Sequence, residues 1–246
     1  MEEKIIYEVL RVINGKSIFL ENHLSRMKNS FELINEKFTL TYEEISRKID
    51  DLIKSENKVE GNIKITYGVH EKILKIFFIK HSYPSNEMYE TGVKTILYFG
   101  ERNNPNAKIV DDNFRKKVNS EIKEKNVYEA ILVNQNGYIT EGSKSNIFMV
   151  KDNELLTSPL KAVLPGVTRG EIIKIAGRLG IKVKEVEYKY SDIDKLDGMF
   201  ISGTSPKVLP ISSVNNINLN PNNSIIRKLF EEYNNEINRY VSNDLK

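Results

Sequence analysis

The sequence predicts a mixed α/β (α+β) protein of two domains, on the basis of three observations. Short apolar or alternating runs, typical of strands, are interleaved with segments whose apolar residues recur at helical spacing. A polar, asparagine-rich stretch with Pro105, "GERNNPNAK", interrupts this pattern. At 246 residues the chain is long enough for two small domains. We therefore expect a small α/β domain over residues 1–99, an interdomain linker over 100–107 and a larger domain over 108–246.

The first domain is predicted to begin with two short strands around the turn Asn14-Gly15, a dipeptide typical of tight hairpins. Thr41 followed by Glu44 is typical of a capping box and predicts the start of a second helix. The first helix is predicted from apolar residues at helical spacing: Leu24, Met27, Phe31 and Ile34. Three further strands are expected in "GNIKITYGV", "KILKIFFIK" and "VKTILYF".

In the second domain, strands and helices are predicted to alternate more closely. "DNFRKKVNSEIKEKN" indicates a helix, and Pro165-Gly166 followed by Gly180 indicates the two ends of another. Strands are expected in "EAILVN", "SNIFMV", "LLTSP", "KVKEVEY" and "GMFISGT". A closing helix is marked by Ile225, Ile226, Leu229, Phe230, Tyr233, Ile237 and Tyr240.

The composition excludes several classes of function. Thirty-seven basic residues stand against 34 acidic ones, and this +3 balance is too weak to predict a nucleic-acid partner. The absence of cysteine excludes disulfides and thiolate chemistry, and three histidines without HxxxH spacing do not predict a metal site. No apolar run approaches the roughly 20 residues of a membrane helix, and the N-terminus is too short and acidic for a signal peptide. We expect a cytoplasmic protein without a membrane partner.

Three polar junctions are candidates for binding an anion. In "LPGVTRG", Gly166 precedes a helix whose free N–H groups, at Val167 and Thr168, suit phosphate. In "ISGTSP", a strand ends in the small residues Gly203 and Thr204. In "HLSRM", Arg26 lies beside the apolar stripe of the first helix, and arginine pairs well with phosphate. Each alone has an ordinary explanation as a helix start, a turn or a solvated side chain.

Two further features carry chemically interesting residues. The hairpin "NQNGYITEGSKSNIFMV" needs only Asn136-Gly137 for its turn, yet it carries a second polar cluster that includes Glu141. Lys108 lies between the two domains with the apolar neighbours Ala107 and Ile109. A desolvated lysine becomes nucleophilic toward carbonyls, although a lysine stem more often packs while its head reaches water.

Four runs in this order resemble the class IV aminotransferases, which are fold-type IV pyridoxal-phosphate enzymes. The runs are "YEVLRVINGKSIFLENHLSRM", "YEAILVNQNGYITEGSKSNIFMV", "LPGVTRG" and "FISGTSPKVLPI". The family includes branched-chain and D-amino-acid aminotransferases and aminodeoxychorismate lyase. The resemblance covers nearly the whole chain and implies a small N-terminal α/β domain with a larger, barrel-like, cofactor-binding C-terminal domain.

The resemblance implies roles for individual residues. Lys108 would form a Schiff base with pyridoxal 5′-phosphate and move a proton as the catalytic residue. Glu141 would meet the pyridine nitrogen, and Arg26 would bind the phosphate. Tyr7 would face the substrate carboxylate, and Tyr67 stands about where D-amino-acid members carry an arginine for it. The remaining cofactor-binding positions are Gly166, Val167, Thr168, Gly203 and Thr204.

The local surroundings of Glu141 carry expectations of their own. Gly142 is expected to leave room for the cofactor ring, and Ser145 and Asn146 are expected to orient Glu141 as hydrogen-bond donors. Asn113 stands where branched-chain members have a tyrosine near the cofactor hydroxyl.

The function that the resemblance implies is transfer of an amino group between an amino acid and a 2-keto acid, by a homodimer. Aminodeoxychorismate lyase, which releases pyruvate to give 4-aminobenzoate, is the alternative enzyme. Val9 stands where that lyase carries its catalytic threonine, which weighs against it. A non-catalytic binding protein on the same fold is the third reading.

Overall fold

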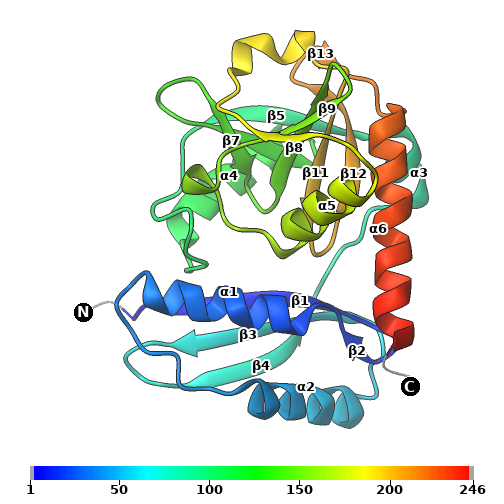
Figure 1. Ribbon diagram of the computed structural model, residues 1–246. Helices are drawn as coiled ribbons and strands as arrows, with labels where there is room; N and C mark the ends of the chain where they lie inside the picture. The colour runs from blue at the N-terminus through cyan, green and yellow to red at the C-terminus, as the bar shows by residue number, and fades with distance from the viewer. Residues whose placement is uncertain (1–2, 244–246) are drawn as a thin grey trace. The chain divides into compact units, whose positions relative to one another are not determined.

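The computed structural model describes residues 3–243, which form two compact units (Figure 1). The described part of the first unit comprises residues 3–82, 107–110 and 235–243. The second unit comprises residues 83–106 and 111–234. Among the described residues, no helix is long and apolar enough to cross a membrane.

The first unit is built on a four-stranded antiparallel sheet of order β2-β1-β3-β4. The hairpin predicted at Asn14-Gly15 is confirmed, and both residues have positive φ, as a type I′ turn requires. The strands are β1 (Ile5–Ile13), β2 (Lys16–Ser17), β3 (Gly61–Gly68) and β4 (Leu74–Ile79).

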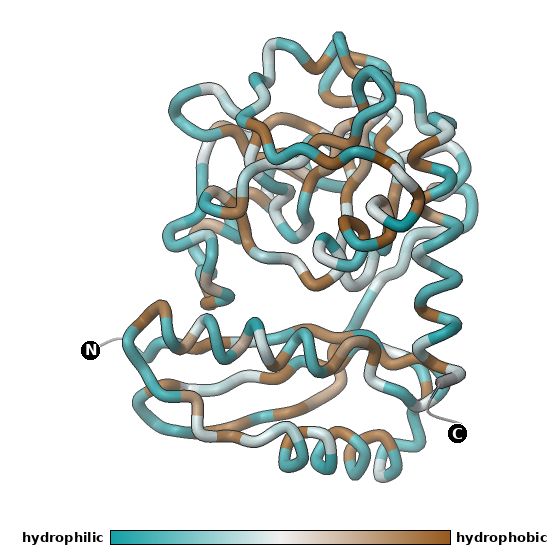
Figure 2. The backbone as a smooth tube through the Cα atoms, in the orientation of Figure 1, coloured by the Kyte–Doolittle hydropathy of each residue, from teal (hydrophilic) through white to brown (hydrophobic). Residues whose placement is uncertain are grey.

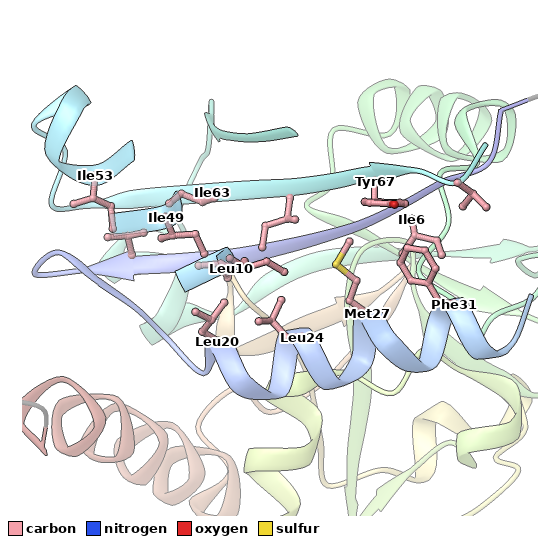
Figure 3. Packing of buried hydrophobic residues seen from close by; sticks show 14 residues of the cluster. Ile6, Leu10, Leu20, Leu24, Met27, Phe31, Ile49, Ile53, Ile63 and Tyr67 are labelled. Atoms are coloured by element: carbon pink, nitrogen blue, oxygen red, sulfur yellow. The ribbon is translucent and has the colours of Figure 1, made fainter. Parts of the chain in front are cut away.

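Two helices, α1 (Leu20–Glu32) and α2 (Tyr42–Glu56), supply the apolar side chains that cover one face of this sheet. Figure 3 shows side chains of both helices pointing toward those of β1 and β3. In Figure 2, α2 changes between hydrophilic and hydrophobic colours around each turn, as an amphipathic helix does. The buried residues of this core are Ile6, Leu10, Val12, Leu20, Leu24, Met27, Phe31, Ile45, Ile49, Ile53, Ile63, Ile65, Tyr67 and Val69.

The second unit contains a closed six-stranded barrel in the order β8-β11-β12-β5-β6-β7, with β7 returning to β8. β5 is parallel to both of its neighbours and the other pairings are antiparallel, so the barrel is mixed. The closing pairing between β7 and β8 consists of one residue pair, Glu141 with Asn146. The barrel strands are β5 (Val93–Phe99), β6 (Glu129–Val133), β7 (Ile139–Gly142), β8 (Asn146–Lys151), β11 (Gly198–Gly203) and β12 (Lys207–Val214).

Further strands are added to the edges of the barrel sheet. β9 pairs with β8 and carries β10 in parallel, and β13 pairs with β12. The remaining elements are β9 (Glu154–Thr157), β10 (Val183–Glu185), β13 (Ile217–Asn218), α3 (Asn86–Thr91), α4 (Asp112–Glu124), α5 (Val167–Arg178), α6 (Ser224–Asn243) and the 3-10 helices η1 (Leu160–Ala162) and η2 (Tyr190–Lys195).

The mixed α+β class and the barrel-like second domain are confirmed, but the two units divide the chain differently from the expected domains. β5 falls within predicted domain 1–99, yet it hydrogen-bonds to β6 and β12 of the barrel. Residues 107–110 lie at and beyond the end of the expected linker, yet they pair with β1. Both differences come from strand pairing between segments far apart in the sequence, which local patterns do not report.

The capping box predicted at the start of α2 is confirmed. Thr41 Oγ1 accepts a hydrogen bond from the N–H of Glu44, and the Glu44 carboxylate accepts one from the N–H of Thr41. We expect Thr41→Ala to lower the free energy of unfolding by about 1 kcal/mol, the usual effect of losing such a cap. Urea denaturation measures this, with Arg47→Ala in the middle of the same helix as control. Equal losses in both variants would show that the cap contributes nothing specific.

Candidate active site

Lys108 is held at the edge of β1 by main-chain hydrogen bonds. The N–H of Tyr7 donates to the carbonyl of Lys108 at 3.1 Å, and the N–H of Val110 donates to Ile5 at 3.1 Å. The N–H of Lys108 donates to Ser30 Oγ at 3.1 Å, and that hydroxyl donates to the Arg26 carbonyl at 3.0 Å. The backbone of Lys108 is therefore tied to both β1 and α1.

The side chain of Lys108 reaches the ring of Tyr7. Its Nζ lies 4.8 Å from the ring centroid, and Nζ of Lys64 lies 5.1 Å from the same centroid. Both are within cation–π range. Side chains alternate along a strand, so Tyr7 and Lys64 lie on the sheet face opposite the α1–α2 core, in which Ile6, Ile63 and Ile65 are buried. Sequence reasoning missed Lys64, although its place between Ile63 and Ile65 signals that it points away from the core.

Arg26, a residue of α1, is buried and forms an ion pair with Glu8 of β1. Its Nε and Nη2 donate to the two carboxylate oxygens of Glu8 at 2.8 and 2.5 Å. His23 Nδ1 lies 2.8 Å from Glu8 Oε2. Because the carboxylate only accepts, we assign the proton to His23 Nδ1. Neither Glu8 nor His23 was a predicted site residue.

The burial of this cluster controls its protonation. Burial alone would raise the pKa of Glu8, but the charge and hydrogen bonds of Arg26, with the hydrogen bond of His23, outweigh it and lower the pKa to about 2. Burial lowers the pKa of His23 below its usual 6.5; Glu8 opposes this, while Arg26 and Lys108 add to it. The cluster therefore holds an ionised glutamate and arginine beside a neutral histidine at neutral pH.

In the second unit, Glu141 of β7 is 3% exposed and accepts hydrogen bonds at both carboxylate oxygens. The N–H of Leu164 donates to Oε2 at 3.0 Å, and Arg102 Nη1 donates to Oε1 at 3.2 Å. Asn146 Nδ2 donates to the carbonyl of Leu164 at 2.9 Å. Asn146 thus acts on Glu141 through the Leu164 residue rather than by the direct contact that we expected.

The structure shows no hydrogen bond from Ser145 to Glu141, although we expected one. Ser145 binds Glu129 instead. Its hydroxyl donates to Glu129 Oε2 at 3.1 Å, while Ser143 donates to Oε1 through both its N–H and its hydroxyl. A Cβ added at Gly142 would lie 2.1 Å from Ser145 Oγ. The space that a Cβ at Gly142 would need is therefore occupied by Ser145, and the expectation that Gly142 leaves room for a cofactor ring stays a prediction.

The two predicted phosphate-binding segments both lie in the second unit. Gly166 is the N-cap of α5 and provides no side-chain cap, and Val167 and Thr168 in the first turn are buried. A Cβ at Gly166 would lie 2.0 Å from Asn146 Oδ1, so only glycine fits beside that side chain. Gly203 ends β11, and Thr204 begins the turn to β12.

Asn146 connects these segments to Glu141. Its main chain pairs with Glu141 on β7 and with Ser202 on β11, and its side chain meets the residues just before α5. The second unit therefore brings together Glu141 with the segments of Gly166–Thr168 and Gly203–Thr204.

Tyr67 lies elsewhere. Tyr67 is 8% exposed in the core of the first unit, and its ring lies 5.2 Å from the ring of Phe31 in an edge-on arrangement. This placement gives Tyr67 a packing role, and its contact with the substrate stays a prediction. No group of histidine, aspartate and glutamate side chains within residues 3–243 is arranged to hold a metal ion.

Comparison with known proteins places this chain in a family. A family model described as amino-transferase class IV matches residues 5–214. The chain belongs to the class IV aminotransferase family. Branched-chain-amino-acid aminotransferase of Escherichia coli K12 is 29% identical over 215 residues, covering 79% of this chain and 70% of that protein.

Two solved structures show the same fold. A Legionella pneumophila protein proposed to be a 4-amino-4-deoxychorismate lyase has a TM-score of 0.85 at 21% identity, covering 94% of this chain and 91% of that one. The branched-chain amino acid aminotransferase of Escherichia coli has a TM-score of 0.85 at 24% identity, covering 94% and 85%. The fold is therefore that of this family, and it does not separate the two reactions.

The Glu8–His23 pair predicts how stability depends on pH. Both groups have a lower pKa in the folded protein, so the unfolded chain binds more protons in acid. We expect the free energy of unfolding to fall as the pH drops below about 6.5, and further between about 4.5 and 2. His23→Gln should remove the first step, whereas His70→Gln, at an exposed position, should keep it. Urea unfolding between pH 3 and 8 measures both, and an unchanged first step in His23→Gln would contradict the assignment.

Proposed function

We propose that this protein is a pyridoxal-phosphate-dependent aminotransferase that exchanges an amino group between an amino acid and a 2-keto acid. The observation that carries the proposal is the fixed position of Lys108, with its backbone held by Tyr7 and Ser30 and its amine over the Tyr7 ring. A buried carboxylate, Glu141, and a helix N-terminus without a side-chain cap at Gly166 support it.

The chemistry of the donors within each unit fits the cofactor. The first unit offers the Lys108 amine and the Arg26 guanidinium, and the second offers the Glu141 carboxylate and the N–H groups at the start of α5. A solved structure of a branched-chain amino acid aminotransferase with the same fold holds pyridoxamine 5′-phosphate. Bound pyridoxal phosphate would supply an aldehyde that combines with amines and a ring that withdraws electrons from the substrate.

Lys108 would hold the cofactor through its amine and, once released, take a proton from the substrate Cα and pass it to the carbon that carried the cofactor's aldehyde. The hydrogen bonds to its backbone limit where the long side chain can reach. The Glu141 carboxylate would hold a proton on the ring nitrogen, because a buried negative charge favours a cation beside it. Arg26 would bind phosphate, with Glu8 fixing the plane of its guanidinium.

Lys64 is our candidate for the group that binds the substrate carboxylate. It shares the ring of Tyr7 with Lys108, on the sheet face away from the core. An ammonium at this position would attract a carboxylate without taking part in proton transfer.

The lyase reading is the second candidate, because the Legionella protein proposed to have that activity shares the fold. Val9 pairs with Lys64 and lies on the same face as Tyr7, so at that position of β1 the chain presents no hydroxyl. We therefore favour the transferase. Assays that follow keto-acid formation from amino donors, and pyruvate release from aminodeoxychorismate, separate the two.

Lys108→Ala should abolish covalent attachment of the cofactor. We expect borohydride reduction of the wild-type protein with pyridoxal phosphate to label the peptide that contains Lys108, and mass spectrometry to find that peptide unlabelled in the variant. Lys64→Ala is the matched control, because its amine lies over the same aromatic ring and yet should leave the label on Lys108. A label on any other lysine of the wild-type protein would contradict the assignment of Lys108 as the attachment site.

Lys64→Met should weaken recognition of the substrate carboxylate. We expect KM for both amino acid and keto acid to rise at least about tenfold, with kcat changing less, because the lost attraction acts mainly on binding. Lys48→Met, on α2, removes the same charge elsewhere and should change neither constant. A fall confined to kcat would assign Lys64 another role.

A further inference from the structure

We propose that Arg102 is a positioning residue for Glu141: its guanidinium keeps this buried carboxylate ionised and aimed at the ring nitrogen of the cofactor. The inference deepens the proposed function and rests on it. Arg102 lies in the segment that we expected to be an interdomain linker, and no motif pointed to it.

The contact is a buried ion pair. Nη1 of Arg102 lies 3.2 Å from Oε1 of Glu141, and the two side chains are 12% and 4% exposed. By contrast, Lys182 and Lys184 pair with Glu154 at the surface, where their side chains are 65% and 42% exposed. Exposed pairs are screened by water and contribute little, whereas a buried charge that loses its partner is strongly disfavoured. The charge of Arg102 therefore bears directly on the protonation of Glu141.

The pair also fixes the direction of the carboxylate. Arg102 binds one oxygen, and the N–H of Leu164 binds the other at 3.0 Å. A carboxylate offers about four acceptor positions, which is more than these two donors use. Arginine stays protonated at every pH that the protein would meet. It can hold the carboxylate in place without competing for the proton that Glu141 shares with the ring.

Two other charged groups of the second unit have partners of their own. Glu129 on the neighbouring strand β6 accepts from Ser143 and Ser145. Arg169 on α5 donates to Glu185 and to a backbone carbonyl. Arg102 is a cation in contact with Glu141, so it supplies compensating positive charge to that carboxylate. Without it, burial favours the protonated acid, which no longer balances a positive ring nitrogen.

The test is the dissociation constant of pyridoxal phosphate, measured by fluorescence titration at pH 6 and pH 8. We expect Arg102→Gln, which keeps hydrogen-bonding capacity but loses the charge, to weaken binding at least tenfold at pH 6 and less at pH 8. Arg102→Lys should restore most of the affinity because it restores the charge. Arg227→Gln is the control: it removes an arginine that binds the backbone carbonyls of Tyr89 and Glu90 in the same unit.

A double-mutant cycle with Glu141→Gln separates positioning from general structural support. If Arg102 acts through Glu141, adding Arg102→Gln to Glu141→Gln should change affinity less than twofold. An equal loss in both backgrounds, or Arg102→Gln binding like the wild type at both pH values, overturns the inference. A wild-type protein that does not bind pyridoxal phosphate overturns the proposed function instead, so the two failures are distinguishable.

Discussion

The candidate residues of both units depend on one constraint: each buried carboxylate must be paired with hydrogen-bond donors. Glu8, Glu129 and Glu141 are each at most 4% exposed, and each is satisfied by donors from other segments. A buried charge without such partners costs several kcal/mol. Each glutamate therefore joins a strand to a helix or loop: Glu8 joins β1 to α1, Glu129 shapes the loop at 143–145, and Glu141 holds the chain before α5.

These pairings extend into continuous hydrogen-bonded paths. In the first unit the path runs from Glu8 to the Arg26 side chain, and from the Arg26 carbonyl through Ser30 to the backbone of Lys108. In the second unit it runs from Glu141 through Leu164 to Asn146, whose side chain lies against Gly166. Within each unit, residues proposed for different parts of the cofactor are thus positioned together, which favours preorganised binding.

What the sequence could predict was set by how local each signal is. The Asn14-Gly15 hairpin and the capping box of α2 depend on neighbouring residues, and both are confirmed. The barrel membership of β5 and the partners of Ser145 depend on pairing between distant segments, so the sequence could not reveal them. The burial of Tyr67 could be predicted, because Ile63 and Ile65 already indicated which face of β3 it shares. Arg102 carried no signal, because an arginine in a polar loop usually points to solvent.

The closure of the barrel has a consequence for how ligand and fold depend on each other. β7 and β8 join at a single residue pair, and Glu141 is one of its two members. Local opening of a structure begins where few hydrogen bonds hold it, so we expect the barrel to open locally at this pair. A molecule that binds Glu141 more tightly when this pair is formed would therefore stabilise the closed barrel as it occupies the site.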